Sequence, residues 1–185
     1  WGTTISTFFE YSRGGRFSYT YAGNINGDTS GQNNDLLYVP TSAEIQQMQF
    51  DPTGNPGQAA AFDNYIAQDD YLSGRRGQYA ERYGAQAPWR GRWDVKFLQD
   101  YKIKISENKT NTIQFSVDVL NFGNLIRSEW GLVQQPNNTS PIGVNVDPAT
   151  LVPTYSFNPN QTETFGYDSS LASRWQMQFG LRYIF

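Results

Sequence analysis

The chain has 185 residues, a net charge of −3, no Cys and no His. The charge provides no basic stripe for a nucleic-acid partner, and the missing His and Cys remove the commonest general base, the commonest metal ligand and thiolate chemistry. The sequence contains no run of about 18 apolar residues, so no transmembrane helix is predicted. Nevertheless, 16% of the residues are aromatic. Strands that alternate across a membrane barrel remain compatible with this composition. The sequence begins at Trp1 with neither Met nor signal peptide, so we expect a processed or partial piece of a longer protein.

The first two segments alternate between apolar and polar residues. The residues that share the apolar side are Ile5, Phe9 and Tyr11 in WGTTISTFFEY, and Phe17, Tyr19 and Tyr21 in RFSYTYAG. A period of two is typical of a strand with two different faces. We therefore predict strands over 2–12 and 15–22, joined by a tight turn at SRGG.

The stretch NINGD opens a long predicted loop over about 23–91 and resembles the start of a calcium loop. Asn24, Asn26 and Asp28 place side-chain oxygens at alternate positions, and a glycine allows the bend. The glutamate that closes such a loop is missing, which favours the competing interpretation of a solvated Asn/Gly turn. We expect no other cofactor.

Short helices and a group of candidate binding residues are predicted in the same loop. TSAE is a capping box with Thr41 as N-cap and Glu44 three residues on, and QAAAFDNYIAQDDYL has apolar residues at helical spacing. The guanidinium and aromatic groups that follow could stack on a sugar or cover a peptide, although we expect most of them to pack the loop against its neighbours. The candidate ligand-binding residues, one of them in the next loop, are Arg75, Arg76, Tyr79, Arg82, Tyr83, Trp89 and Trp130.

Three more segments, RWDVKFLQDYKIKI, TIQFSVDVL and RWQMQFGLRYIF, predict strands over 92–105, 111–121 and 173–185. The short stretch SENKT joins the first two, and a loop rich in Pro and Asn, over about 122–172, precedes the third. Short turns alternating with long loops are typical of outer-membrane barrels, with turns in the periplasm and loops outside the cell. A tilted strand that crosses a bilayer needs about 9–11 residues, which these segments supply.

The alternation predicts two faces with different surroundings. In a membrane barrel the apolar face contacts lipid, and the polar face meets a plug or a wet lumen. In the alternative, a soluble β-sandwich binding module, the apolar face packs on a second sheet. The predicted lipid-facing residues are Trp93, Val95, Phe97, Phe115, Val117, Met177, Phe179 and Leu181. The predicted lumen-facing residues are Asp94, Lys96, Gln114, Asp118, Gln176, Gln178 and Arg182.

The stretches GGRFSYTYAGNINGDTSGQNNDLLYVP, APWRGRWDVKFLQDYKI, TIQFSVDVLNFGNLIRSEWG and RWQMQFGLRYIF together resemble the end of a TonB-dependent outer-membrane receptor. The most similar type is the Oar-like and SusC-like receptors of the Bacteroidetes. The resemblance implies an all-β, antiparallel transmembrane barrel of about 22 strands, of which residues 1–185 would hold the last five. It implies import of an oligosaccharide, peptide or chelate across the outer membrane of a Gram-negative bacterium. The implied partners are lipid, the receptor's own plug, TonB through an N-terminal region outside these residues, and a surface lipoprotein.

The resemblance gives the last strand a second role. Outer-membrane proteins end in a strand with an aromatic last residue, which the barrel-assembly machinery recognises. The residues that fit this assembly signal are Trp175, Phe179, Tyr183 and Phe185. The alternative is that these residues only form the lipid-facing band and its aromatic girdle, and both roles are compatible.

Two other classes of function compete with transport. Catalysis is not expected, because without His no nucleophile can be paired with a base, and the neighbours Asp69 and Asp70 would point to different sides of a helix. A non-transporting barrel that acts as adhesin or scaffold would share every feature above. It would differ in lacking a plug and a TonB box, so the residues upstream of Trp1 would distinguish the two.

Overall fold

The computed structural model describes residues 1–28 and 33–185. The chain is mostly β, with antiparallel sheets. It divides into two compact units, the first made of residues 1–14, 88–134 and 167–185, and the second of residues 15–87 and 135–166. Among the described residues, no helix combines the length and the apolar character needed to cross a membrane.

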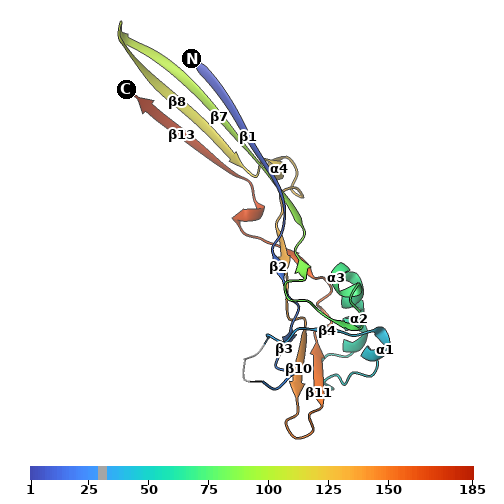
Figure 1. Cartoon of the computed structure of the whole chain (residues 1–185). Helices are drawn as coiled ribbons and strands as arrows, with labels where there is room; N and C mark the ends of the chain where they lie inside the picture. The colour runs from blue at the N-terminus through green and yellow to red at the C-terminus, as the bar shows by residue number, and fades with distance from the viewer. Residues whose placement is uncertain (29–32) are drawn as a thin grey trace. The chain divides into compact units, whose positions relative to one another are not determined.

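The first unit is built on a long four-stranded antiparallel sheet in the order β1-β7-β8-β13 (Figure 1). Its strands are β1 (Gly2–Arg13), β7 (Trp89–Ser106), β8 (Lys109–Leu120) and β13 (Gln176–Ile184). Each pair runs with few interruptions, and β1 pairs along its whole length, from Gly2 opposite Asp100 to Arg13 opposite Trp89. These four strands confirm the strands predicted over 2–12, 92–105, 111–121 and 173–185, with shifts of a few residues at their ends.

A tight hairpin joins β7 to β8. Ser106 pairs with Lys109, so Glu107 and Asn108 form a two-residue loop, a common length for a tight β-hairpin. A register shift between Lys104 and Ser106 lies just before the turn. The other connections in this sheet, from β1 to β7 and from β8 to β13, are long.

The strand predicted over 15–22 is wrong, and with it the count of five strands and the tight turn at SRGG. This segment forms β2 (Arg16–Phe17), which pairs with β6 (Ala85–Gln86), and β3 (Tyr21–Ala22), which runs parallel to β10 (Ile142–Val146). Tyr19 and Tyr21 are buried in the core of the second unit. Alternation of apolar and polar residues indicates that one side of a segment is shielded from water, but it does not show whether lipid or protein shields it.

The second unit holds a compact core with three short helices. They are α1 (Ser42–Ile45), α2 (Gln58–Gln68) and α3 (Asp70–Ser73), which confirms the prediction of short helices in the loop. Its other strands are β4 (Tyr38–Val39), paired with β5 (Gln78–Tyr79), and β11 (Pro153–Phe157), paired with β10. The core includes the fully buried residues Tyr19, Leu37, Ile45, Phe62, Ile66, Leu72 and Ile142. Both long connections of the sheet therefore contribute to a single hydrophobic core.

A buried carboxylate connects three parts of this core. Asp69 Oδ2 accepts hydrogen bonds from the Tyr19 hydroxyl at 2.7 Å and from the Thr164 hydroxyl at 2.6 Å. Asp69 Oδ1 accepts the backbone N–H of Leu72 at 2.8 Å, which caps α3. Burial and the adjacent Asp69 carboxylate raise the pKa of Tyr19, so its hydroxyl keeps its proton and remains a donor.

The predicted capping box at α1 is confirmed. The Thr41 backbone N–H donates to Glu44 Oε2 at 2.7 Å, and the Glu44 N–H donates to Thr41 Oγ1 at 3.3 Å. Hydrogen bonds from the Thr41 backbone and side chain, and from the Tyr38 hydroxyl, lower the pKa of Glu44.

We expect the lowered pKa of Glu44 to make α1 sensitive to acid. The ionised carboxylate stabilises the folded state above the pKa it has when unfolded, and this stabilisation is lost as the pH falls through the lower, folded value. Hydrogen exchange of the α1 amides, corrected for intrinsic rates, should speed up in that acid range. Glu44→Gln should abolish this pH dependence, and an unchanged profile in that variant would contradict the assignment to Glu44.

Three shorter elements complete the chain. The helix α4 (Phe122–Ile126) follows β8 directly, after Asn121 in a left-handed conformation with φ 53°. The strand β9 (Gln134–Pro136) pairs with β12 (Phe165–Tyr167), and the 3-10 helix η1 (Leu171–Ser173) precedes β13.

Candidate functional site

The pairing register of the sheet separates its side chains into two faces. Residues directly opposite on neighbouring strands share a face. One such row crosses all four strands and consists of Ile5, Phe97, Val117 and Phe179. The other predicted lipid-facing residues lie at odd-numbered positions of the same strands and share this apolar face. The predicted lumen-facing residues lie at even-numbered positions and share the opposite face.

The apolar face is open along its edge strands β1 and β13, whereas Val95, Phe97 and Val117 on the central strands are half-buried. Ile5 is 70% exposed, Phe179 65% and Leu181 78%. Among the described residues, no second sheet covers these side chains. A continuous apolar surface of this extent is unusual on a monomeric soluble protein and marks a surface that contacts something else.

The polar face carries charged and amide groups that pair across the strands. Lys96 Nζ lies 2.9 Å from Asp118 Oδ1, and Gln114 Nε2 donates to Asp100 Oδ1 at 2.9 Å. Lys96, Gln114, Asp118, Gln178 and Arg182 line a shallow hollow of about 380 Å³ on this face. Opposite charges placed on adjacent strands stabilise the register as well as each other.

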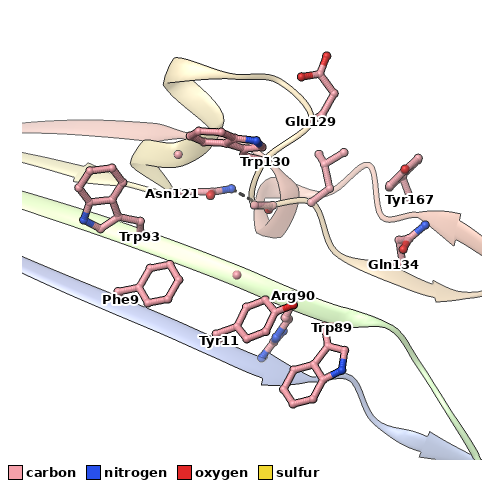
Figure 2. Close-up of a pocket in the computed structure, with 14 residues that line it drawn as sticks. Phe9, Tyr11, Trp89, Arg90, Trp93, Asn121, Glu129, Trp130, Gln134 and Tyr167 are labelled. Atoms are coloured by element: carbon pink, nitrogen blue, oxygen red, sulfur yellow. Dashed lines mark hydrogen bonds between the residues drawn. The ribbon is translucent and has the colours of Figure 1, made fainter.

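A second cavity, of about 430 Å³, lies on the apolar side near α4, at the end of the sheet away from the β7–β8 hairpin (Figure 2). Its aromatic lining consists of Phe9, Tyr11, Trp89, Trp93, Trp130 and Tyr167. We refer to it as the aromatic cavity. Its size and lining are those of a small-molecule site, in which aromatic walls carry a few polar groups.

Gly91 makes room for one wall of the aromatic cavity. Tyr11 lies directly opposite Gly91 in the register, so no side chain of β7 stands in its way. The Tyr11 ring can therefore lie across β7 and stack on Trp89, with ring centroids 5.0 Å apart and planes 6° apart. A β-carbon at position 91 would lie 3.4 Å from Tyr11 Cδ2, in van der Waals contact with the ring.

The opposite wall is a loop held by asparagine side chains. Asn121 Nδ2 donates to the Gly131 carbonyl at 3.0 Å, and Asn124 Nδ2 donates to the carbonyls of Ser128 and Trp130, both at 2.9 Å. These bonds fix the chain on both sides of Trp130, which Figure 2 shows above Asn121.

Trp93 completes the contact between this loop and the sheet. Its ring meets Phe122 of α4 edge-on, with centroids 4.9 Å apart. Its indole N–H donates to Thr7 Oγ1 at 2.6 Å. The indole is therefore fixed on two sides and forms a rigid part of the cavity wall.

The predicted ligand-binding residues do not form one site. Of the seven, only Trp89 and Trp130 line the aromatic cavity. Arg75 and Arg76 hold the second unit together, as expected for most of the group: Arg75 pairs with Glu81, and Arg76 Nη2 lies 2.7 Å from Asp63 Oδ1.

The remaining predicted residues lie on the outside of the second unit. The Arg82 guanidinium lies 5.4 Å from the centre of the Tyr83 ring. Tyr79 is 65% exposed and Tyr83 56% exposed. A ligand-binding role for these three residues stays a prediction.

Sequence reasoning missed four aromatic residues of the cavity. They are Phe9, Tyr11, Trp93 and Tyr167. Phe9 and Trp93 are opposite each other in the register, but only the pairing of β1 with β7 brings them together. The available signal was an excess of aromatic residues near the ends of several strands, with a glycine between Trp89 and Trp93.

The predicted calcium residues form a network of turn hydrogen bonds. Asn24 Oδ1 accepts the Gly27 N–H at 2.8 Å, and Asn26 Oδ1 accepts the Asp28 N–H at 2.9 Å. Asp35 Oδ1 accepts from Asn26 Nδ2 at 2.7 Å. These bonds are typical of the Asx turns in the competing interpretation. No group of three or more acidic side chains suited to a metal occurs among the described residues, and calcium binding stays a prediction.

The residues of the predicted assembly signal are exposed. Phe179 stacks loosely on Phe115 at 6.4 Å, and Tyr183 stacks on Phe185 at 6.0 Å. Asn111 Nδ2 donates to the Tyr183 hydroxyl. Trp175 is 45% exposed, and its backbone N–H donates to Asn124 Oδ1 at 3.2 Å. Recognition of these residues by an assembly machinery stays a prediction.

Comparison with known proteins gives no match: no protein family, no curated protein and no solved structure is significantly similar to the chain.

Proposed function

We propose that residues 1–185 form part of the transmembrane barrel of a TonB-dependent outer-membrane receptor. The observation that carries the proposal is the two-faced sheet, with an open apolar face and a polar face of paired charges. Lipid would cover the first, and a plug or water the second. The strands contain 12, 18, 12 and 9 residues, against about 9–11 needed to cross a bilayer at a tilt.

The connections support an orientation for this barrel segment. Periplasmic turns of such barrels are short and extracellular loops long. The hairpin at Glu107 and Asn108 would therefore lie in the periplasm, and the second unit and α4 outside the cell. Both edges of the sheet, β1 and β13, would pair with further strands, because unpaired backbone groups are not tolerated in lipid.

The activity we propose is uptake of an oligosaccharide, peptide or chelate through this barrel. The receptor's plug and TonB would couple uptake to energy, and a surface lipoprotein would assist capture. The barrel-assembly machinery would insert the strands into the outer membrane. Uptake that stops when TonB is deleted would support transport, whereas adhesion that is independent of TonB would identify a scaffold.

Single-cysteine labelling tests the proposed topology. The 185 residues contain no Cys, so each introduced thiol in this segment of the full-length receptor reports one position. On intact cells we expect a water-soluble maleimide to label Leu151→Cys in the β10–β11 hairpin, which is 74% exposed. Asn108→Cys should react only after the outer membrane is permeabilised.

Leu181→Cys should resist the water-soluble reagent under both conditions and react with a lipid-soluble one. Gln178→Cys on the opposite face is the matched control within the same strand, and it should not react with the lipid-soluble reagent. Rapid labelling of Leu181→Cys by the water-soluble maleimide would disprove the membrane placement of the apolar face.

A further inference from the structure

We propose that the aromatic cavity binds the sugar headgroup of an outer-leaflet glycolipid. This inference rests on the proposed function, because it takes the apolar face as lipid-facing. The cavity is continuous with that face and lies beside α4, at the end of the sheet assigned to the outside. That position is the level of the membrane–water interface, where Trp and Tyr are enriched because one end of each side chain is apolar and the other wet.

The cavity offers flat rings together with unused hydrogen-bond donors. The stacked pair of Tyr11 and Trp89 forms a platform on which the C–H face of a sugar ring can lie. Within the described residues, the indole N–H groups of Trp89 and Trp130 and the hydroxyls of Tyr11 and Tyr167 donate to no protein acceptor. A hydroxylated ligand would supply the acceptors for these groups.

The polar groups of the cavity favour a sugar over a bare phosphate. Glu129 contributes a carboxylate, while Gln134 and Asn121 contribute neutral amides. Arg90 also lines the cavity, from an even-numbered position of β7, so the lining carries one cationic and one anionic side chain. A phosphate would require cationic partners, whereas hydroxyl groups bind well to carboxylates and amides.

A buried acceptor in the wall is left without a partner. The Asn121 side chain is 4% exposed, and its Oδ1 accepts no hydrogen bond from the described part of the protein. Leaving such a group unsatisfied is unfavourable, and native proteins contain few of them. The oxygen itself is shielded from the surface, so a ligand hydroxyl would reach it only after a shift of the neighbouring side chains.

The test measures binding to the full-length receptor in detergent. The probes are lipopolysaccharide, the oligosaccharide released from it by removing the acyl chains, and phosphatidylglycerol. We expect lipopolysaccharide to bind most tightly, with its Kd raised about tenfold by Trp130→Ala or by Trp89→Ala. Tyr101→Ala is the matched control, since Tyr101 of β7 is exposed on the same unit outside the cavity lining, and it should leave the Kd unchanged. Tyr11→Phe keeps the ring and removes one donor, so it should raise the Kd about threefold without disturbing the fold.

Equal Kd values for wild type and all cavity variants would overturn the proposal. So would phosphatidylglycerol or the free oligosaccharide binding as tightly as lipopolysaccharide with the same dependence on Trp130. Failure of the proposed function is recognised separately, because Leu181→Cys would then react with the water-soluble maleimide. If that position is shielded and Trp130→Ala still binds normally, only the glycolipid site is wrong.

Discussion

Replacing Val117 with Arg should destabilise the assembled barrel by about 2–4 kcal/mol, the range for an Arg or Lys placed on the lipid face near the bilayer midplane. Val117 belongs to the row of apolar residues that crosses all four strands, between Phe97 and Phe179. The Arg would be forced towards lipid, because the strand alternation leaves it no route to the polar face. The measurement is the urea-unfolding free energy of the full-length receptor in vesicles, together with its amount in the outer membrane.

Gln178→Arg is the matched control for this substitution. Gln178 lies on the polar face, opposite Asp118 in the register, so an Arg there gains an acidic neighbour. We expect unchanged stability and unchanged amounts of receptor. If both variants lost stability equally, the two faces would have equivalent surroundings, and the membrane interpretation would fail.

Removing the buried carboxylate of Asp69 should unfold the second unit locally. Asp69→Ala leaves the Tyr19 hydroxyl, the Thr164 hydroxyl and the Leu72 N–H without their acceptor. Hydrogen bonds to a charged group contribute about 1.5–3 kcal/mol each, and a buried donor left unpaired costs about 1–3 kcal/mol. We expect a loss of at least about 3 kcal/mol, seen as faster proteolysis and hydrogen exchange across residues 15–87 and 135–166.

The neighbouring residue offers a clean comparison. Asp70 is exposed, so Asp70→Ala should change the opening free energy obtained from the same hydrogen-exchange measurement by less than about 0.5 kcal/mol. Thr164→Val removes one donor and leaves the carboxylate, and its effect should fall between those two. Loss of stability in Asp70→Ala equal to that in Asp69→Ala would show that the hydrogen-bond network is not the cause.

The long strands of the sheet were predictable because their evidence is local. In β13, Met177, Phe179 and Leu181 alternate with glutamines and a glycine. This pattern predicts a strand without any knowledge of the strand that pairs with it. The capping box at Thr41 and Glu44 is local in the same way. Both features depend on residues within one element.

The core of the second unit was not predictable because its contacts join distant segments. Tyr21 lies opposite Ile142 in a parallel pair, and neither segment indicates the other. The same holds for the aromatic cavity, where Tyr11 meets Trp89 only through the register of β1 with β7. The alternation of Phe17, Tyr19 and Tyr21 predicted a barrel strand, but Tyr19 and Tyr21 are buried in the protein core of the second unit.

The shared core of the second unit has a consequence for the order of folding. The Thr20 and Ser140 hydroxyls, separated by 120 residues in sequence, lie 2.7 Å apart within this unit. Closing a loop of that length in a free chain is entropically unfavourable and slows folding. Strand pairs that formed first would hold the ends of both connections close together and would remove most of that closure entropy. The four-stranded sheet would then form first. The second unit would fold later, after the paired strands have brought the ends of its two segments close together.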